Sequence, residues 1–215
     1  MEPNWEKSIN TFKIGYSNIG DEGVFALAPF FSKNTSLQNV DLSFVNFSPK
    51  SLKVLSKCIS DRKENKLTPI LTWFLHGNNC RENLDEFARS FDGGHSYTIG
   101  LSAASITTRQ IEAFLAALPA SVKLKHLNVS NNDCKNWEGT GLVNREVKEF
   151  EGNGLQHGNM RQITTKLLKG NKDLTVLKFS HNSLTSSDIQ VRRSEQRRTA
   201  GAKRQQKRFT AFQHN

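Results

Sequence analysis

Cysteine is scarce in this chain, and the three that occur, Cys58, Cys80 and Cys134, are too few and too scattered to form a disulfide framework. Sparse cysteine is typical of a reducing compartment, so we expect an intracellular location, cytoplasmic or nuclear. The chain also lacks an apolar run of the roughly 20 residues that a membrane helix needs. Its first residues show no basic segment followed by an apolar stretch, so we expect neither a secretory signal nor a membrane partner.

Motifs for catalysis and for metal binding are missing as well. The sequence has no Gly-Lys-Ser/Thr phosphate loop, no Cys-x-x-Cys pair and no His-Glu-x-x-His. The six histidines are scattered, so a metal site would have to form from residues far apart in the chain. We therefore expect no catalytic residue, no metal and no cofactor, and we interpret the chain as a protein that is not an enzyme.

Positive charge is concentrated at the C-terminal end. The formal net charge is +10, and residues 191–215 hold eight basic residues and one acid. The basic residues are Arg192, Arg193, Arg197, Arg198, Lys203, Arg204, Lys207 and Arg208. This segment has little apolar surface, so we expect a disordered or loosely helical tail. A basic tail can bind nucleic acid or an acidic partner, or it can be only a solvated terminus.

What the chain does contain is an internal repeat. An 11-residue template places apolar residues at positions one, four, six and eleven, and a polar residue, often Asn, at position nine. Matches begin at residues 9, 37, 70, 96, 124 and 174, and the fourth is weaker because it begins with Ser96. Asn stands at position nine in three of them, as Asn78, Asn132 and Asn182. Apolar residues two apart indicate one face of a strand.

The spacing changes after each of the first four matches. Apolar residues then follow the i, i+3, i+4, i+7 pattern of one helix face, with one gap in the second set. These sets are Val24, Leu27, Ala28 and Phe31; Leu52, Leu55 and Ile59; Leu84, Phe87, Ala88 and Phe91; and Ile111, Phe114, Leu115 and Leu118. Strands alternating with helices predict a parallel sheet with helices on one side, in which each unit buries its apolar face against its neighbours.

Three stretches of the sequence carry a family resemblance. Residues 19–28 read Ile-Gly-Asp-Glu-Gly-Val-Phe-Ala-Leu-Ala, and residues 36–43, which follow them, read Ser-Leu-Gln-Asn-Val-Asp-Leu-Ser. The third stretch is residues 124–132. They resemble leucine-rich repeats of the ribonuclease-inhibitor type, and the resemblance covers roughly residues 8–185. It implies an α/β, right-handed solenoid with a concave parallel sheet of about six strands, convex helices and protein partners. The family includes ribonuclease inhibitors, activators of the small GTPase Ran and sensing regions of immune receptors.

Three departures from the repeat set the expected boundaries. The charged run at 61–66 is interpreted as a surface loop, and residues 135–160 as an insertion, followed by a helix near 160–169. We assign the solenoid to residues 1–190 and the basic tail to 191–215. After residue 184 the apolar helix stripe fails, which predicts a C-terminal end that is open, or loosely covered, and available for self-association.

Strand residues that alternate with the buried ones predict the binding face. The residues that we expect to contact a partner there are Lys13, Tyr16, Asp41, Phe44, Phe74, His76, His126 and Asn128. Aromatic residues carry much of the energy of protein interfaces, so Tyr16, Phe44 and Phe74 are the candidate anchors. The alternative is that these rings pack on one another or under a loop.

The functional prediction is a scaffold that binds a partner protein of unknown identity on the concave face. The first alternative is binding of nucleic acid or an acidic partner by the tail. The second is regulation of a small GTPase, although no loop residue stands out for that role. The face is nearly neutral, which argues against inhibition of basic ribonucleases.

Overall fold

The computed structural model describes residues 9–134, 137–142, 147–152, 154, 162–163, 167 and 174–178. Strands and helices alternate through most of this part of the chain. In order they are β1 (Thr11–Lys13), α1 (Gly20–Lys33), β2 (Asn39–Asp41), α2 (Pro49–Glu64), β3 (Thr72–Phe74), α3 (Leu84–Ser90), β4 (Ser96–Gly100), α4 (Thr108–Ala117), β5 (Lys123–Asn128), β6 (Glu149–Glu151) and β7 (Val176–Lys178).

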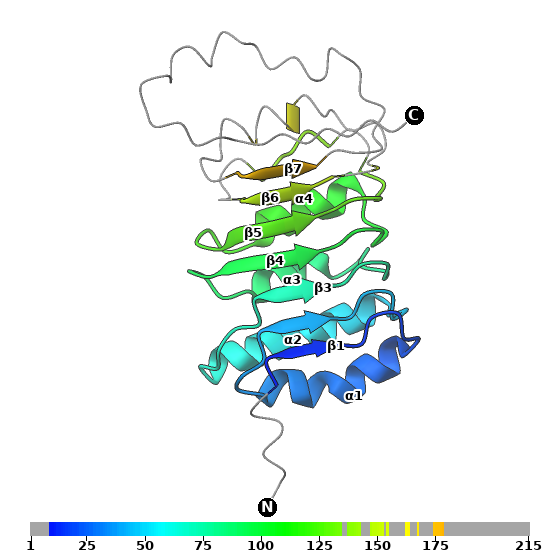
Figure 1. The fold of residues 1–215 in the computed structure, drawn as a ribbon, viewed down its shortest axis with the longest axis vertical. Helices are drawn as coiled ribbons and strands as arrows, with labels where there is room; N and C mark the ends of the chain where they lie inside the picture. The colour runs from blue at the N-terminus through cyan, green and yellow to red at the C-terminus, as the bar shows by residue number, and fades with distance from the viewer. Residues whose placement is uncertain are drawn as a thin grey trace, which may run out of the picture.

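The strands form one parallel sheet whose spatial order, β1 to β7, is the order of the sequence. Figure 1 shows the strands stacked from β1 to β7, with α1 to α4 side by side behind them, so one face of the sheet is covered by helices. Each helix packs on the next, α1 on α2, α2 on α3 and α3 on α4. The expected α/β solenoid is confirmed, with seven strands in the described residues where the template gave about six.

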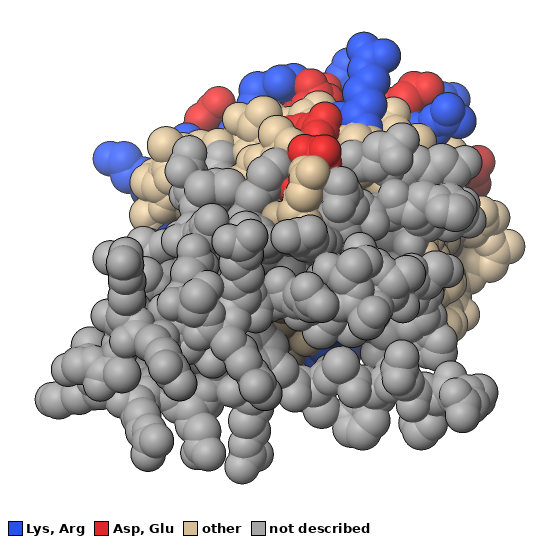
Figure 2. All heavy atoms as spheres, turned by 90° about the horizontal axis from the view of Figure 1, so that it is seen from above, with Lys and Arg blue, Asp and Glu red and all other residues tan. Residues whose placement is uncertain are grey.

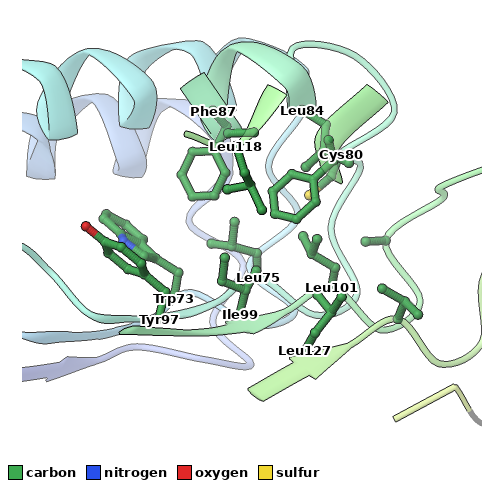
Figure 3. Close-up of a cluster of buried hydrophobic side chains, with 14 of the residues drawn as sticks. Trp73, Leu75, Cys80, Leu84, Phe87, Tyr97, Ile99, Leu101, Leu118 and Leu127 are labelled. Atoms are coloured by element: carbon green, nitrogen blue, oxygen red, sulfur yellow. The ribbon is translucent and has the colours of Figure 1, made fainter. Parts of the chain in front are cut away.

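The template residues build the core between the sheet and the helices. In Figure 3, Trp73 lies in β3 and Leu75 follows directly after it, and both are next to Ile99 and Leu101 of the following repeat. All four side chains point toward Phe87 on α3. Each of these side chains is fully buried. The inner face of the sheet and the apolar stripe of each helix therefore meet as the two periodicities predict.

Asn78 shows why the template favours asparagine at position nine. Its Oδ1 accepts hydrogen bonds from the backbone amides of Val45 and Phe47, both at 3.2 Å. Its Nδ2 donates to the carbonyls of Leu42, Leu75 and His76 at 2.7–3.2 Å. The side chain therefore satisfies the backbone where the preceding repeat leaves its strand, where no ladder bond is available. Asn132 repeats this arrangement with the amides of residues 104 and 106.

The weak fourth match is explained by a bulge in β4. The register shifts between Tyr97 and Thr98, so that Ser96 pairs with Lys123 and Tyr97 pairs with Leu124. Tyr97 is 1% exposed and fills the apolar position that Ser96 cannot. Its hydroxyl donates to the backbone carbonyl of Asp92 at 3.0 Å, which satisfies the one polar group that it buries. A one-residue bulge thus restores the core.

The segment expected as an insertion contributes a strand. β6 lies within residues 135–160 and pairs with β5 on one side and β7 on the other. Val147 and Phe150 are buried at the first and fourth template positions, but Gly152 takes the sixth, and this hides the repeat. Of the helix expected near 160–169, the structure describes residues 162, 163 and 167, which are helical. The C-terminal end, which was expected to be open or loosely covered, lies outside the described residues.

The charged run at 61–66 is not a surface loop throughout, because α2 continues to Glu64. Arg62 is 2% exposed and its guanidinium donates to the carbonyls of Phe31, Asn34, Leu37 and Thr68 at 2.5–3.2 Å. Burial lowers the pKa of this arginine. The guanidinium joins the end of α1 to the chain that enters β2, because carbonyls there lack helical partners.

The N-terminal ends of two helices carry recognisable caps. Ser48 precedes α2, its hydroxyl accepts from the amide of Lys50 at 3.3 Å, and Pro49 begins the helix. Thr107 precedes α4 and forms a capping box with Gln110. None of the helices in the described part of the chain has the length and apolarity that a membrane crossing requires.

Candidate functional site

The face of the sheet opposite the helices, which we call the open face, is lined by strand side chains that alternate with the buried ones. Register pairing places Lys13 beside Asp41 and Asp41 beside Phe74. Further along the same row, Asn128 pairs with Gly100 and with Glu151. The expected site residues of different repeats therefore do meet on one face, in rows that cross the strands.

A second row follows the ends of the strands and has an unusual backbone. In five successive repeats the residue at this position is left-handed: Tyr16 (φ 63°), Phe44 (φ 55°), Gly77 (φ 67°), Ala103 (φ 51°) and Asn131 (φ 57°). Their conformation is fixed by the neighbouring repeat. The amide of Tyr16 donates to the carbonyl of Ser43 at 2.8 Å, and that of Phe44 donates to the carbonyl of His76 at 2.7 Å.

Tyr16 and Phe44 form a stacked pair of rings on this row, which we call the aromatic pair. Their ring centroids are 4.8 Å apart and their planes differ by 12°. Tyr16 is 81% exposed and Phe44 41% exposed, so the pair is open to solvent although the rings pack on each other. The far side of Phe44 lies over Gly77, where a Cβ would collide with the ring. The expected alternative, that the rings pack on each other, is therefore confirmed for Tyr16 and Phe44, and their role as anchors for a partner stays a prediction.

Phe74 behaves differently from the aromatic pair. Its ring stacks on that of His76, with centroids 5.6 Å apart, and both rings lie against Gly100, where a Cβ would collide with them. Phe74 and His76 are half-buried. Of the three expected anchors, two are therefore strongly presented to solvent and the third is partly enclosed by its own neighbours.

His76 is held in one orientation at the middle of the open face. Its Nδ1 accepts a hydrogen bond from the amide of Ser102 at 3.0 Å, so Nδ1 carries no proton in this arrangement. Burial lowers the pKa of His76, and nearby Asp41 opposes that shift while His126 adds to it. The imidazole is therefore favoured in its neutral form near pH 7.

Glu151, which the template missed, organises the polar end of the open face. Its Oε1 lies 2.8 Å from Nζ of Lys178 and 3.2 Å from Nε2 of His126. Its Oε2 accepts from the side-chain amide of Asn128 at 3.1 Å. Of these groups, His126 and Asn128 were among the residues expected on this face, and the carboxylate that joins them was not. This cluster neutralises its own charge.

Charge on the described surface is mixed. In the view of Figure 2, Lys and Arg side chains alternate with Asp and Glu along the part of the surface that is not grey. The basic tail, with Arg192, Arg193, Arg197, Arg198, Lys203, Arg204, Lys207 and Arg208, lies outside the described residues. The prediction that it binds nucleic acid or an acidic partner stays a prediction.

The cysteines are buried rather than reactive. Burial raises the pKa of Cys80 and of Cys134 to about 12, and it raises the pKa of Cys58 as well. Thiolates are the reactive form, so these thiols are poor nucleophiles. Within the described ranges no group of three His, Cys, Asp or Glu side chains is placed to hold a metal ion.

Comparison with known proteins agrees with this fold. A family model described as "Leucine Rich repeat" matches residues 7–28, which include β1 and the first turns of α1. Together with the parallel sheet and its alternating helices, the match identifies the fold as a leucine-rich-repeat solenoid. Proteins built from this repeat generally mediate protein–protein interactions. The finer resemblance to the ribonuclease-inhibitor type stays a prediction.

One curated relative is a Rho GTPase-activating protein, gacW, from Dictyostelium discoideum. It is 24% identical over 196 residues, which cover 86% of this chain and 17% of the relative. The chain therefore spans less than a fifth of the relative's length. The activity in the relative's name belongs to a protein most of which has no counterpart here.

Proposed function

We propose that this chain is a protein-binding scaffold whose partner docks on the open face, with the aromatic pair as anchor. The observation that carries the proposal is the exposure of two stacked rings, at 81% and 41%, on adjacent repeats of an otherwise polar face. Aromatic side chains are enriched among the residues that dominate interface energies. The proposal assigns no catalysis to the chain and places it inside the cell.

Backbone strain supports a functional reason for these rings. A residue with a Cβ in the left-handed region costs about 1 kcal/mol relative to glycine, which takes the same position in the third repeat as Gly77. Tyr16 offsets little of that cost by burial, because most of its ring is in water. Glycine or asparagine would fold as well at this position, so the fold alone does not require an aromatic residue there.

The rest of the open face suits the rim of an interface. Asn128, Glu151 and Lys178 bond to one another, so a partner need not satisfy them. His76 already accepts a hydrogen bond at Nδ1, from the amide of Ser102. Polar groups that already bond to one another, on the same face as exposed aromatic rings, resemble the polar rim that borders the apolar core of a protein interface.

Affinity capture tests this proposal. The full chain and its Tyr16→Ala/Phe44→Ala variant are immobilised, and retained proteins are compared by quantitative mass spectrometry. We expect one or a few proteins to lose at least tenfold in recovery with the variant. Phe25→Ala is the matched control, because Phe25 is also 41% exposed but lies on α1, away from the open face. Equal losses with both variants, or with neither, would contradict the proposal.

Regulation of a small GTPase is the second candidate, and the observation that favours it is the similarity to a protein named as a Rho GTPase-activating protein. Because the match covers 17% of that relative, we propose for this chain a docking role toward the GTPase rather than the hydrolysis step itself. Addition of the chain to a Rho-family GTPase, with GTP hydrolysis and binding measured in parallel, tests this candidate. Binding without faster hydrolysis is the expected result, and absence of both removes the candidate.

A further inference from the structure

The carboxylate of Asp41 lies at the foot of the aromatic pair. Its Oδ1 accepts a hydrogen bond from the amide of Ser43 at 3.0 Å, and Ser43 directly precedes Phe44. On the neighbouring strand, Gly15 directly precedes Tyr16. A Cβ at Gly15 would lie 3.3 Å from the same Asp41 oxygen. The carboxylate is therefore placed between the two backbone segments that carry the aromatic rings.

The residues next to the Asp41 carboxylate are small, and the carboxylate lies close against the backbone of Gly15. Gly15 has no side chain, and a Cβ there would also come within 3.2 Å of the Ser43 carbonyl oxygen. Ser43 is small and 5% exposed. Phe74, the register partner on β3, lies against Gly100 on the strand beyond. The carboxylate is therefore flanked by small residues that directly precede the two aromatic rings in the chain.

Asp41 has no ion-pair partner among the residues that the structure describes. The ion pairs found among the described residues involve Asp85, Asp92 and Glu151, and Asp41 takes part in none of them. Lys13 is its register partner on β1, yet it is exposed and forms no ion pair with Asp41 there. Glu151, by contrast, has Lys178, His126 and Asn128 around it. Glu151 is therefore held in an ion pair, whereas the Asp41 carboxylate is bonded only to the amide of Ser43 among the described residues.

We propose that Asp41 and the aromatic pair together bind an arginine side chain of the partner protein. This inference rests on the proposed function, since it names the chemistry of the group that docks at the anchor. A guanidinium is planar, pairs with a carboxylate through two N–H groups and stacks on aromatic faces. Both recognition elements stand side by side here. A lysine ammonium can use the charge of Asp41 but gains less from the flat rings.

The test uses two short fluorescein-labelled peptides, one with three arginines separated by glycines and one with three lysines in their place. Binding to the full chain is measured by fluorescence anisotropy at low salt. We expect the arginine peptide to bind at least fivefold more tightly than the lysine peptide. Because the chain carries a net charge of +10, general electrostatics opposes both peptides, and measurable binding has to come from a local site.

Four variants should each change the affinity for the arginine peptide in a stated direction, or leave it unchanged. Asp41→Asn keeps the size of the side chain and the acceptor for Ser43, and we expect it to weaken the arginine peptide at least tenfold. Lys13→Met removes a competing cation, and we expect binding a few-fold tighter. Tyr16→Leu/Phe44→Leu should remove the preference for arginine over lysine. Glu149→Gln, a carboxylate on the same face and on β6, is the control and should change the affinity less than twofold.

The outcomes separate this inference from the proposed function. Equal affinity for both peptides, or an Asp41→Asn variant that binds normally while circular dichroism shows it folded, overturns the arginine site but leaves partner capture by the aromatic pair intact. If the Tyr16→Ala/Phe44→Ala variant captures the same proteins as the unchanged chain, both the proposed function and the arginine site are overturned.

A further variant tests whether the chain's own tail fills the site at Asp41. In this full-length variant, Gln replaces Arg192, Arg193, Arg197 and Arg198. Loss of four positive charges also weakens the general repulsion of a cationic peptide, so the same changes are made in the Asp41→Asn chain. Binding that tightens more in the chain with Asp41 than in the Asp41→Asn chain would assign the site to the chain's own tail and overturn its assignment to a partner.

Discussion

Replacement of Asn78 by alanine is the sharpest test of how the repeats hold together. The substitution removes five hydrogen bonds that one buried side chain makes to the backbone of two repeats. The amides of Val45 and Phe47 lose the acceptor that they share. A buried group left without a partner costs about 1–3 kcal/mol, and water that enters the space left by alanine offsets part of this. We expect the free energy of unfolding to fall by about 3 kcal/mol.

Urea denaturation followed by circular dichroism measures the effect. The midpoint should fall, and the slope of the free energy against urea should stay the same if the solenoid still unfolds as one unit. Asn78→Asp is a second variant, and we expect it to be at least as harmful because a carboxylate cannot donate to the three carbonyls. The control is Asn79→Ala, since Asn79 is exposed and its side chain accepts only from the amide of Arg81. A loss below 1 kcal/mol for Asn78→Ala would refute the reasoning.

The pKa of His76 is lowered by burial, so stability should be full above about pH 6.5 and should fall as the pH drops through that lowered pKa. NMR titration of the imidazole C–H signals should show this midpoint below 6.5, and a normal midpoint would contradict the enclosed, neutral state. Arg62→Met should cost about 3 kcal/mol because it leaves buried carbonyls unpaired, whereas Arg89→Met, which removes an exposed ion pair with Asp85, should cost less than about 0.5 kcal/mol. With a thiol pKa of about 12, Cys80 should not react with a thiol reagent at pH 8 until urea unfolds the chain, and rapid labelling of the native protein would show that the pocket opens.

Much of the fold could be predicted because its signals are local. The template has apolar residues at positions one, four, six and eleven. This spacing places the corresponding side chains on the same face in every repeat that follows it. The alternation at residues 40 and 42 gave the strand of the second repeat, and the set from Leu84 to Phe91 gave the face of α3. These patterns persist because each repeat buries its core against neighbours of the same shape.

The elements that the template missed depend on contacts between repeats. β6 was hidden because Gly152 replaces an apolar residue, and only its pairing with β5 and β7 makes Glu149–Glu151 a strand. The bulge that brings Tyr97 into the core follows from the pairing with β5. Arg62 looks like a surface charge in a charged run, and its burial depends on carbonyls 25 to 31 residues away in sequence, and on a closer one at Thr68.

The candidate site was predicted in part for the same reason. Alternation along the strands correctly assigned Asp41 and Phe74 to the open face, and the exposed rings of Tyr16 and Phe44 follow from their place just past the strands. Glu151 could not be assigned, because its strand was not recognised. The stacking of Tyr16 on Phe44 depends on the left-handed backbone of both residues, which no spacing rule for the apolar positions reveals.

Site-specific photo-crosslinking is the most direct test of the claim that a partner binds at the aromatic pair. A photoreactive phenylalanine analogue is placed at position 16 in one full-length protein and at position 25 in another, and each is irradiated in the presence of the captured partner. Both positions carry exposed aromatic residues, but position 25 lies on α1 and position 16 just past the end of β1. The account predicts a covalent adduct from position 16 and none from position 25. An adduct from position 25 alone would contradict it.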